Sequence, residues 1–423
     1  MELFPVSLVS VEIGQHLGRP LKIGNCHIMR APIAVLSLSL ALAACNFQFG
    51  GDDAKKTAAT PGVVNVTPVN AFAAHDPAAG QALDPVLADD KPRPLMQAQV
   101  VLDRLGFTPG VVDGRDGLST RNAISGFQEA NALPVTGKLD PATTQGLARW
   151  NNIPATRVVT IPADFAAGPF AKLPKEPADQ AKLPALGYET LDEKLAERFH
   201  TTVATLAELN PDRAGGAPAM ASEATGATAS PPASSPAPGS PLPSRFSAGQ
   251  QIRVPNIGGD QIEPASVKDA KWLDTLAMLG VGSEQPPAAK IVVSKSKGTL
   301  KAFDSSDKLI GMFTATMGSA NDPLPLGEWK ITGVARNPTF HYNPKLFWDV
   351  ADSESKEKLP SGPNNPVGVA WIDLTKEHYG IHGTPKPETI GRAESHGCVR
   401  LTNWDVARLA QMVSPKTQVL FEA

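Results

Sequence analysis

The chain has 423 residues and a formal net charge of −3 at pH 7, so it is long enough for about two or three domains rather than one core. The near-neutral charge, with no concentrated basic stripe in the sequence, gives no support for a nucleic-acid partner. Its 40 prolines and 36 glycines gather in a few segments, as is typical of linkers between folded parts.

A secretion signal is predicted ahead of Cys45. Arg30 supplies a positive charge, residues 31–42 form an apolar run too short to span a bilayer, and small residues follow. The ending LAAC at 42–45 resembles a bacterial lipobox, which implies cleavage before Cys45 and a lipid on its sulfur; the alternative is a buried apolar helix with an incidental cysteine. We therefore expect residues 1–45 to hold a misassigned start and a lipoprotein signal peptide. The exported protein would then face the periplasm, with its anchor in the outer membrane.

Two further parts are predicted before residue 150. Residues 46–92 are rich in alanine, proline, threonine and aspartate without a sustained period, which predicts a flexible linker. Residues 93–150 predict a small all-α domain, because apolar residues recur at helical spacing from Leu95 onward. Its second helix is expected to begin at an N-cap at Ser119-Thr120.

Turn, cap and core residues of this small domain follow a definite order: Gly106-Phe107, Asp113-Gly114, Gly117, Thr120, Phe127-Gln128, Leu133, Gly137 and Asp140. The set resembles the peptidoglycan-binding type 1 domain, which implies peptidoglycan as a partner. The alternative is any three-helix module that uses the same residue types for turns and core. If the domain is of the peptidoglycan-binding type, we expect it to position the protein on the cell wall, within a distance set by linker length, and to take no part in the chemistry.

Residues 186–256 predict a third folded part. A helix is expected from Leu191 to Phe199, then a second helix capped by Thr201-Thr202, and a strand at 248–255. The order resembles a LysM glycan-binding module, which implies glycan as a partner, split by the Ala/Pro/Ser-rich insert 213–245. This insert is predicted to be disordered, and loop-closure entropy grows slowly enough with length to tolerate it. The alternative is a linker with an amphipathic helix.

The C-terminal region, residues 289–423, is predicted to be mostly β. Strand-like runs occur at 290–293, 309–317, 329–334 and 418–421, and residues 404–412 show helical spacing. We expect a twisted sheet or sandwich with few helices. The fold class of the whole chain is therefore multidomain, with a mostly-β C-terminal domain, a small all-α domain near the N-terminus and disordered linkers.

The strongest chemical signal is a lone cysteine in a glycine-containing turn, Ser395-His396-Gly397-Cys398-Val399-Arg400. Glycine permits a tight turn, which can aim backbone N–H groups at a developing oxyanion. A free thiol is mostly protonated near neutral pH, so it needs a nearby base. His396 and His382 compete for that role. We favour His382, because it comes from a separate segment and can approach the sulfur from the side, as thiol acyl transfer requires.

The paired motifs Ile381–Thr384 and Ser395–Arg400 resemble the signature of the L,D-transpeptidase (YkuD-type) catalytic domain, and the resemblance extends back to about residue 289 through Pro325–Trp329 and Gly362–Gly368. It implies that Cys398 is the nucleophile and His382 the base.

The remaining motif residues are assigned supporting roles. The Gly383 carbonyl could orient the imidazole ring, in place of the carboxylate of other triads. Backbone N–H groups of Gly397 and Cys398, with that of His396, would form the oxyanion hole, and Ser395 would support the turn.

The resemblance implies a transferase that acts on peptidoglycan stem peptides in cell-wall biogenesis and needs neither cofactor nor metal. The thiolate attacks the L,D bond after the third residue of a tetrapeptide stem and expels the terminal D-alanine, and an amine acceptor resolves the thioester. The acceptor stays open. A diaminopimelate amine gives cross-linking, a lipoprotein lysine gives anchoring, and water gives hydrolysis.

Two residues are candidates for substrate binding. Arg400 either binds a substrate carboxylate or pairs with an acidic residue at the rim, and Tyr342 either lines the donor site or packs in an aromatic core. Two rival classes remain: a non-enzymatic wall-binding lipoprotein and a metal enzyme. The zinc ligands would be His341, His378, His382, His396 and Cys398. The spacing of known zinc motifs is missing from the sequence, and the intact cysteine and histidine motifs argue against a degenerate domain.

Overall fold

The computed structural model describes residues 87, 91–211, 242–258, 263, 266–346, 355–393, 395 and 397–423. All of them lie in one compact unit, residues 65–423. The predicted signal with Cys45, most of the linker 46–92, most of the insert 213–245, and His396 lie outside the described residues. Among the residues described, no helix has the length and apolar character needed to cross a membrane.

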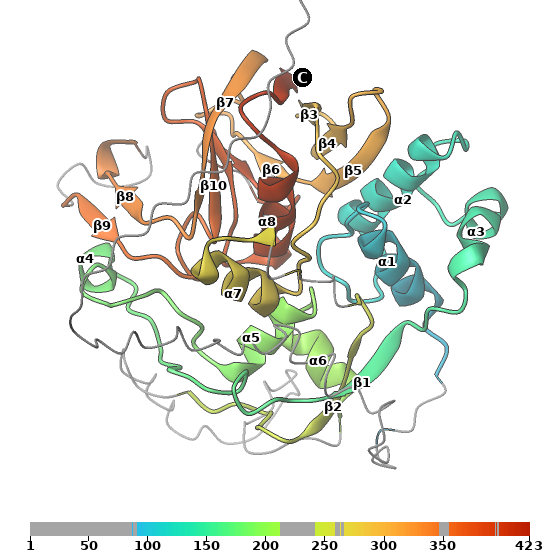
Figure 1. The fold of residues 1–423 in the computed structure, drawn as a ribbon, viewed down its shortest axis with the longest axis horizontal. Helices are drawn as coiled ribbons and strands as arrows, with labels where there is room; N and C mark the ends of the chain where they lie inside the picture. Colours follow the sequence, from blue (N-terminus) through green and yellow to red (C-terminus); the bar gives the residue numbers. More distant parts are fainter. Residues whose placement is uncertain are drawn as a thin grey trace, which may run out of the picture. The chain divides into compact units, whose positions relative to one another are not determined.

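The N-terminal part of the described chain is helical. Its elements are α1 (Pro94–Arg104), α2 (Leu118–Ala130), α3 (Pro141–Leu147) and a 3-10 turn (Ala148–Trp150) (Figure 1). The N-cap of α2 is Gly117, so the predicted N-cap at Ser119-Thr120 is wrong. The reason is that the buried Thr120 hydroxyl accepts a hydrogen bond from Gln99 Nε2 at 3.0 Å and donates one to the Arg115 carbonyl at 3.2 Å. It therefore fixes the preceding turn.

Next along the chain, two helices are flanked by two paired strands. The elements are β1 (Thr156–Thr160), α5 (Leu191–Arg198), α6 (Val203–Leu209) and β2 (Gln251–Pro255), with the short helix α4 (Pro177–Gln180) between β1 and α5. β1 pairs antiparallel with β2, and Thr202 caps α6 by accepting the Thr205 N–H at 3.1 Å. The pairing strand β1 precedes residue 186, where the LysM-like module was expected to start. Glycan binding by the LysM-like module stays a prediction.

Within the described part of the chain, nine strands form one sheet in the order β5-β4-β3-β13-β7-β10-β11-β12-β6. Their bounds are β3 (Lys290–Ser294), β4 (Thr299–Phe303), β5 (Leu309–Thr314), β6 (Thr316–Met317), β7 (Gly327–Arg336), β10 (Ala370–Leu374), β11 (Gly380–His382), β12 (Val399–Arg400) and β13 (Gln418–Glu422). The pairs β13–β3 and β11–β12 are parallel, and the other neighbouring pairs are antiparallel. A separate hairpin joins β8 (Phe340–Tyr342) to β9 (Glu357–Leu359), with a 3-10 turn (Pro344–Leu346) after β8.

This sheet is curled until its two edges approach each other. β5 and β6 stand at opposite ends of the strand order, yet Ala315 alone separates them in the chain. Because one residue spans at most about 3.6 Å, the adjoining ends of β5 and β6 must be close together, and the sheet is nearly closed and barrel-like. The mostly-β prediction for this region is confirmed.

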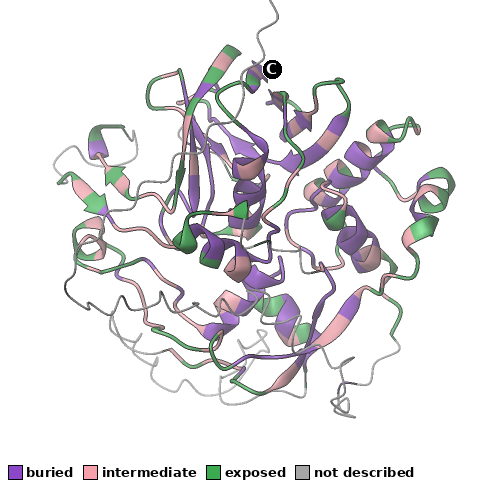
Figure 2. Cartoon of the chain, in the orientation of Figure 1, coloured by how far each residue is buried: buried purple, intermediate pink, exposed green. Residues whose placement is uncertain are grey.

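Two helices complete the core of the sheet: α7 (Ala270–Leu279) and α8 (Asn403–Met412). α8 is buried along most of its length (Figure 2), and its Trp404 is fully buried. Trp272 and Leu276 of α7 belong to the same apolar cluster as Trp404 and strand residues such as Val293. The hydrophobic core of the sheet therefore extends to α7, upstream of residue 289.

The helical domain is packed directly against the edge strand β5. Phe107 and Ile124 share an apolar cluster with Leu309 and Met312. The backbones also pair, because the Met312 N–H donates to the Gly106 carbonyl at 3.0 Å and the Thr108 N–H donates to the Met312 carbonyl at 2.9 Å. The helical domain is therefore joined to the sheet by direct contacts as well as by the chain between them.

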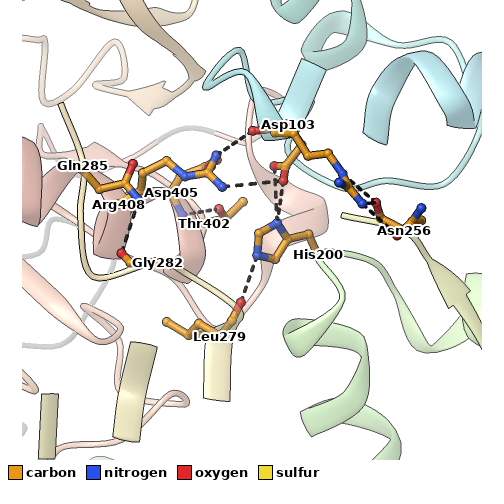
Figure 3. A network of polar contacts seen from close by, with 10 residues as sticks. Asp103, His200, Asn256, Leu279, Gly282, Gln285, Thr402, Asp405 and Arg408 are labelled. Atoms are coloured by element: carbon orange, nitrogen blue, oxygen red, sulfur yellow. Dashed lines mark hydrogen bonds and ion pairs between the residues drawn. The ribbon is translucent and has the colours of Figure 1, made fainter. Parts of the chain in front are cut away.

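A buried polar network joins three parts of the chain (Figure 3). Asp103 on α1 lies 3.3 Å from Nδ1 of His200, which follows α5, and 3.6 Å from Nη2 of Arg408 on α8. His200 Nε2 is 2.9 Å from the Leu279 carbonyl, and the ring stacks on Trp404. Burial by itself would raise the pKa of Asp103, but His200 and Arg408 together hold it below its ordinary value, so the carboxylate is ionised.

Candidate active site

The turn that carries Cys398 is held by side chains on both sides. Ser395 Oγ accepts the Gly318 N–H at 2.7 Å and donates to the Cys398 carbonyl at 2.6 Å. Gly397 has φ +93°, and a Cβ there would lie 2.5 Å from Cε1 of Tyr379. A side chain would therefore be excluded at Gly397 by both conformation and space.

The pairing of β11 with β12 brings His382 and Arg400 to the cavity that Cys398 also lines. β11 and β12 pair in parallel with Ile381 beside Val399 and His382 beside Arg400. Ile381 and Val399 are fully buried in the apolar core. Because side chains alternate along a strand, His382 and Arg400 point to the other face, while Cys398 lies in the bend that directly precedes β12. Cys398, His382 and Arg400 all line one cavity.

The orientation of the His382 ring is fixed by a backbone carbonyl. Its Nδ1 lies 2.7 Å from the Gly383 oxygen, and because a carbonyl can only accept, Nδ1 carries the proton and Nε2 carries the lone pair. The ring stacks on Trp371, with centroids 5.3 Å apart and planes at 17°. Gly383 itself allows no side chain, since a Cβ would lie 2.3 Å from Oδ1 of Asn403.

Electrostatics favour the uncharged forms of both reacting groups. Burial, with a contribution from Arg400, lowers the pKa of His382 to about 3, although the Gly383 hydrogen bond opposes this. Burial raises the pKa of the Cys398 thiol and Asp322 adds to the effect, while a Gly380 backbone hydrogen bond and Arg400 oppose it. At neutral pH the site therefore holds a thiol and a neutral imidazole, which can take the thiol proton as attack proceeds.

The cavity in front of Cys398 has a volume of about 700 Å³. Its lining includes Tyr342 and Leu359 from the β8–β9 hairpin, and Lys175 and Gln180 from the segment around α4. This segment precedes the catalytic region in the chain by more than a hundred residues, so one wall of the cavity comes from outside that region.

The α4 segment is held against the catalytic region at its C-terminal end. The Leu186 N–H donates to the Ser361 carbonyl at 2.9 Å, and the Asn364 N–H donates to the Leu186 carbonyl at 3.0 Å. Asn364 Nδ2 also donates to the Gly187 carbonyl at 2.9 Å. These bonds tie the α4 wall to the loop that follows β9.

The structure brings most of the sequence-predicted residues together. Cys398, His382, Arg400 and Tyr342 line the cavity, while Ser395, Gly397 and Gly383 fix the turn and the ring beside it. His396 is not among the described residues. Within the described part of the chain, no three His, Cys, Asp or Glu side chains lie close enough to hold a metal ion.

Sequence reasoning missed three contributors to the cavity. Trp371 gave no signal beyond an apolar strand position, and Asp322 gave none beyond a turn residue. The α4 segment, with its prolines, was indistinguishable from a linker.

A cysteine and a tautomer-fixed histidine face one large cavity on a curled β-sheet. In agreement, residues 288–420 match the family model described as "L,D-transpeptidase catalytic domain", and residues 94–147 match "Putative peptidoglycan binding domain". The protein thus carries an L,D-transpeptidase (YkuD) catalytic domain preceded by a type 1 peptidoglycan-binding domain.

Curated relatives agree with this assignment at a distance. The chain is 51% identical over 129 residues to "Putative L,D-transpeptidase YkuD" of Bacillus subtilis (strain 168), covering 30% of this chain and 63% of the relative. It is 29% identical over 165 residues to the protein of the same description from Bacillus licheniformis, covering 39% of this chain and 79% of the relative. It is 28% identical over 135 residues to "Probable L,D-transpeptidase YbiS" of Escherichia coli (strain K12), covering 31% and 44%.

Solved structures include L,D-transpeptidase 3 from Mycobacterium tuberculosis with a faropenem-derived adduct, at 19% identity and a TM-score of 0.27. The match covers 32% of this chain and 61% of that chain. A likeness at this level carries no argument about mechanism.

Proposed function

We propose that the protein is a peptidoglycan L,D-transpeptidase whose nucleophile is Cys398 and whose base is His382. The observation that carries the proposal is that Cys398 and His382 line the same cavity, while the bond from His382 Nδ1 to the Gly383 carbonyl leaves the Nε2 lone pair for the thiol proton. The peptidoglycan-binding domain supports peptidoglycan as the substrate, and two cell-wall-acting domains imply an extracytoplasmic location.

The first step acylates the enzyme. The thiol of Cys398 passes its proton to His382 Nε2 while the sulfur attacks the carbonyl of the L,D bond after the third residue of a tetrapeptide stem. Backbone N–H groups of Gly397 and Cys398, with that of His396, stabilise the oxyanion, and losing one such donor typically slows a reaction by about a hundredfold or more. The proton then moves to the amine of D-alanine, which leaves, and a thioester remains.

The second step transfers the acyl group. An amine acceptor attacks the thioester carbonyl, the carbon–sulfur bond breaks, and the thiol of Cys398 is restored. Arg400 lines the same cavity and its charge acts on both Cys398 and His382, so we assign it to a substrate carboxylate. Tyr342 lines the donor side from the β8–β9 hairpin.

Carbapenem acylation tests the nucleophile. Intact-mass measurement of the purified chain should show one adduct, which peptide mapping assigns to Cys398, and Cys398→Ala should show none while keeping the circular dichroism spectrum of the native protein. Muropeptide analysis of a deletion strain, with and without the complementing chain, should show L,D cross-links that depend on Cys398. An adduct on Cys398→Ala would exclude the assignment.

The proposal also includes a lipid anchor at Cys45, supported by the sequence pattern from Arg30 to Cys45. One acyl chain binds membranes only marginally, so several are expected. Cells fed an alkyne fatty acid should label the native protein but not Cys45→Ser. Equal labelling of both proteins would contradict the anchor.

A further inference from the structure

One carboxylate in the active-site cavity takes no part in the reaction described above. Asp322 lines the cavity together with Cys398 and Tyr379. Its Oδ2 atom is buried and has no hydrogen-bond partner among the described residues. A buried acceptor without a protein donor is unfavourable, so Oδ2 is suited to accept a hydrogen bond from a donor on a bound substrate.

The loop between β6 and β7 holds this carboxylate in a fixed place. The Ser319 N–H donates to the Asp322 carbonyl at 2.8 Å, and the Asp322 N–H donates to Ser319 Oγ at 2.9 Å. At the start of the loop, the Gly318 N–H donates to the same Ser395 hydroxyl that donates to the Cys398 carbonyl. The loop and the turn of the nucleophile are therefore connected through Ser395, which fixes Asp322 relative to the sulfur.

Asp322 is unfavourable for the first step of the reaction. Burial raises the pKa of Cys398, and the Asp322 carboxylate raises it further. Burial also raises the pKa of Tyr379, with the same carboxylate contributing. A negative charge beside the sulfur opposes formation of a thiolate, so its benefit must lie in another step. The second step brings an acceptor amine, which arrives as a cation at neutral pH.

We infer that Asp322 binds the ammonium group of the acceptor and holds it beside the Cys398 thioester. The inference rests on the proposed function. The ammonium donates a hydrogen bond to Oδ2 and loses one proton to solvent through the carboxylate. The resulting amine attacks the thioester carbonyl, a carbon–nitrogen bond forms and the carbon–sulfur bond breaks. The second amine proton passes through His382 to the sulfur.

Atoms and charge balance in this step: a thioester and an ammonium give an amide, a thiol and one released proton. Charge also separates the possible acceptors. A cationic amine is attracted by Asp322, whereas water is uncharged and gains no such attraction. The carboxylate therefore favours transfer to an amine over hydrolysis, which distinguishes two of the acceptor classes that the sequence leaves open.

The test compares the fate of the acyl-enzyme in the full chain and in Asp322→Asn. A tetrapeptide stem serves as donor. Diaminopimelate is the acceptor that presents an ammonium group, and hydroxylamine, uncharged at about pH 8, is the neutral acceptor; mass spectrometry gives the ratio of transfer to hydrolysis. In Asp322→Asn, the diaminopimelate concentration for half-maximal transfer should rise about tenfold or more, as expected for a lost charge-assisted hydrogen bond. The hydroxylamine ratio should stay the same.

Acylation by a carbapenem should become faster in Asp322→Asn, because the charge that opposes the thiolate is gone. A merely structural role would slow both steps. Glu377→Gln is the matched control: it removes another carboxylate from the same cavity, one that faces His378 at 3.5 Å, and should leave the transfer ratio unchanged. Asp322→Glu keeps the charge and should keep the preference for the cationic acceptor.

An unchanged response to diaminopimelate in Asp322→Asn would overturn the inference. An equal loss in Glu377→Gln, or an equal loss with hydroxylamine, would overturn it as well. Failure of a different kind is also recognisable: if the unmodified chain is acylated by neither the stem peptide nor the carbapenem, the proposed function itself is wrong, and the role of Asp322 is excluded with it.

Discussion

Cys398 and His382, the pair that we propose as nucleophile and base, are both uncharged at rest. Lowering the pKa of a histidine favours the neutral imidazole, and raising the pKa of a cysteine favours the thiol, so both shifts oppose a thiolate–imidazolium pair. The proton must then move during attack on the substrate carbonyl. On this proposal, activation of the thiol depends on substrate binding, which brings the carbonyl to the sulfur.

Alkylation of Cys398 by iodoacetamide tests this charge state. The rate constant, followed for the Cys398 peptide by mass spectrometry, should rise steadily with pH and reach its midpoint above the ordinary cysteine pKa of about 8.5. The same peptide in the unfolded chain serves as control and should react faster at about pH 8, because its thiol is no longer buried. A plateau between about pH 5 and 8 would instead indicate a preformed ion pair.

At the residue scale the sequence was informative where a motif is local. Cys398 with its turn, and His382 with Gly383, lie within short segments, and the backbone explains why each glycine must be there. Trp371 and Asp322 could not be predicted, because strand pairing and a loop bring them to the cavity from distant positions. No spacing within a short segment of the sequence indicates that these two residues lie at the cavity.

Between elements, one buried carboxyl joins α5 to α8. Glu197 accepts a hydrogen bond from Asn403 Nδ2 at 2.7 Å and bonds to the Tyr188 hydroxyl. Burial raises its pKa to about 8, even though its bonds to Tyr188 and Asn403 lower it. Glu197 is therefore mostly protonated in the folded protein at pH 7.

This carboxyl makes stability depend on pH in a defined direction. The folded-state pKa of Glu197, about 8, lies above the ordinary value of 4.5, so the folded state binds more protons than the unfolded state between these values. The stabilisation is therefore fully present below about pH 4.5 and is lost as pH rises through about 8. Thermal unfolding should therefore show a Tm that falls between about pH 5 and 9. Glu197→Gln mimics the protonated carboxyl and should show a smaller fall over that range; identical slopes for the two proteins would contradict this role.

Elements were predicted well where hydrophobic periodicity is strong. The strand runs at 290–293, 329–334 and 418–421 and the helix at 404–412 form as expected, because each has an apolar face in the core. The run at 309–317 is divided at Ala315 into β5 and β6, which lie at opposite ends of the strand order. Elements were less predictable where tertiary contacts determine their position or their first residue. β1 pairs with β2, which lies more than ninety residues further along the chain. The start of α2 differs from the prediction because the Thr120 hydroxyl is hydrogen-bonded to the Arg115 carbonyl.

Across the whole molecule, the Asp103 network connects the helical domain, the α5–α6 part and the catalytic domain. Asp103→Asn would remove the buried carboxylate charge that Arg408 and His200 share, which is expected to lower the free energy of unfolding by about 3–5 kcal/mol. Chemical denaturation measures this value. Asp116→Asn breaks an exposed ion pair with Arg121 in the same domain and should change it by less than about 1 kcal/mol. Equal effects of the two substitutions would contradict a structural role for the network.

The contact between α2 and β5 supports a second prediction at this scale. A Cβ on Gly126 would lie 2.7 Å from Sδ of Met312 and 2.9 Å from Cδ1 of Phe107. Gly126→Val should therefore force the helical domain away from the sheet, destabilising the protein by about 1–3 kcal/mol, and calorimetry should resolve a broader or divided transition.

Gly333 in β7 is the matched control, because a Cβ there meets nothing within 4 Å and valine is favoured in strands. Gly333→Val should keep the native transition. If Gly126→Val also kept it, the two domains would not be coupled through this contact.

The packing of the helical domain on β5 also has a consequence for how the chain folds. An uncovered edge strand offers its backbone groups to strands of other molecules and invites aggregation. Here, Gly106 and Thr108 occupy such groups at Met312. Because a chain is made from its N-terminus, residues 94–147 are complete before β5 is synthesised. The segment that would bind the wall is thus available first as an intramolecular chaperone for the sheet that follows it.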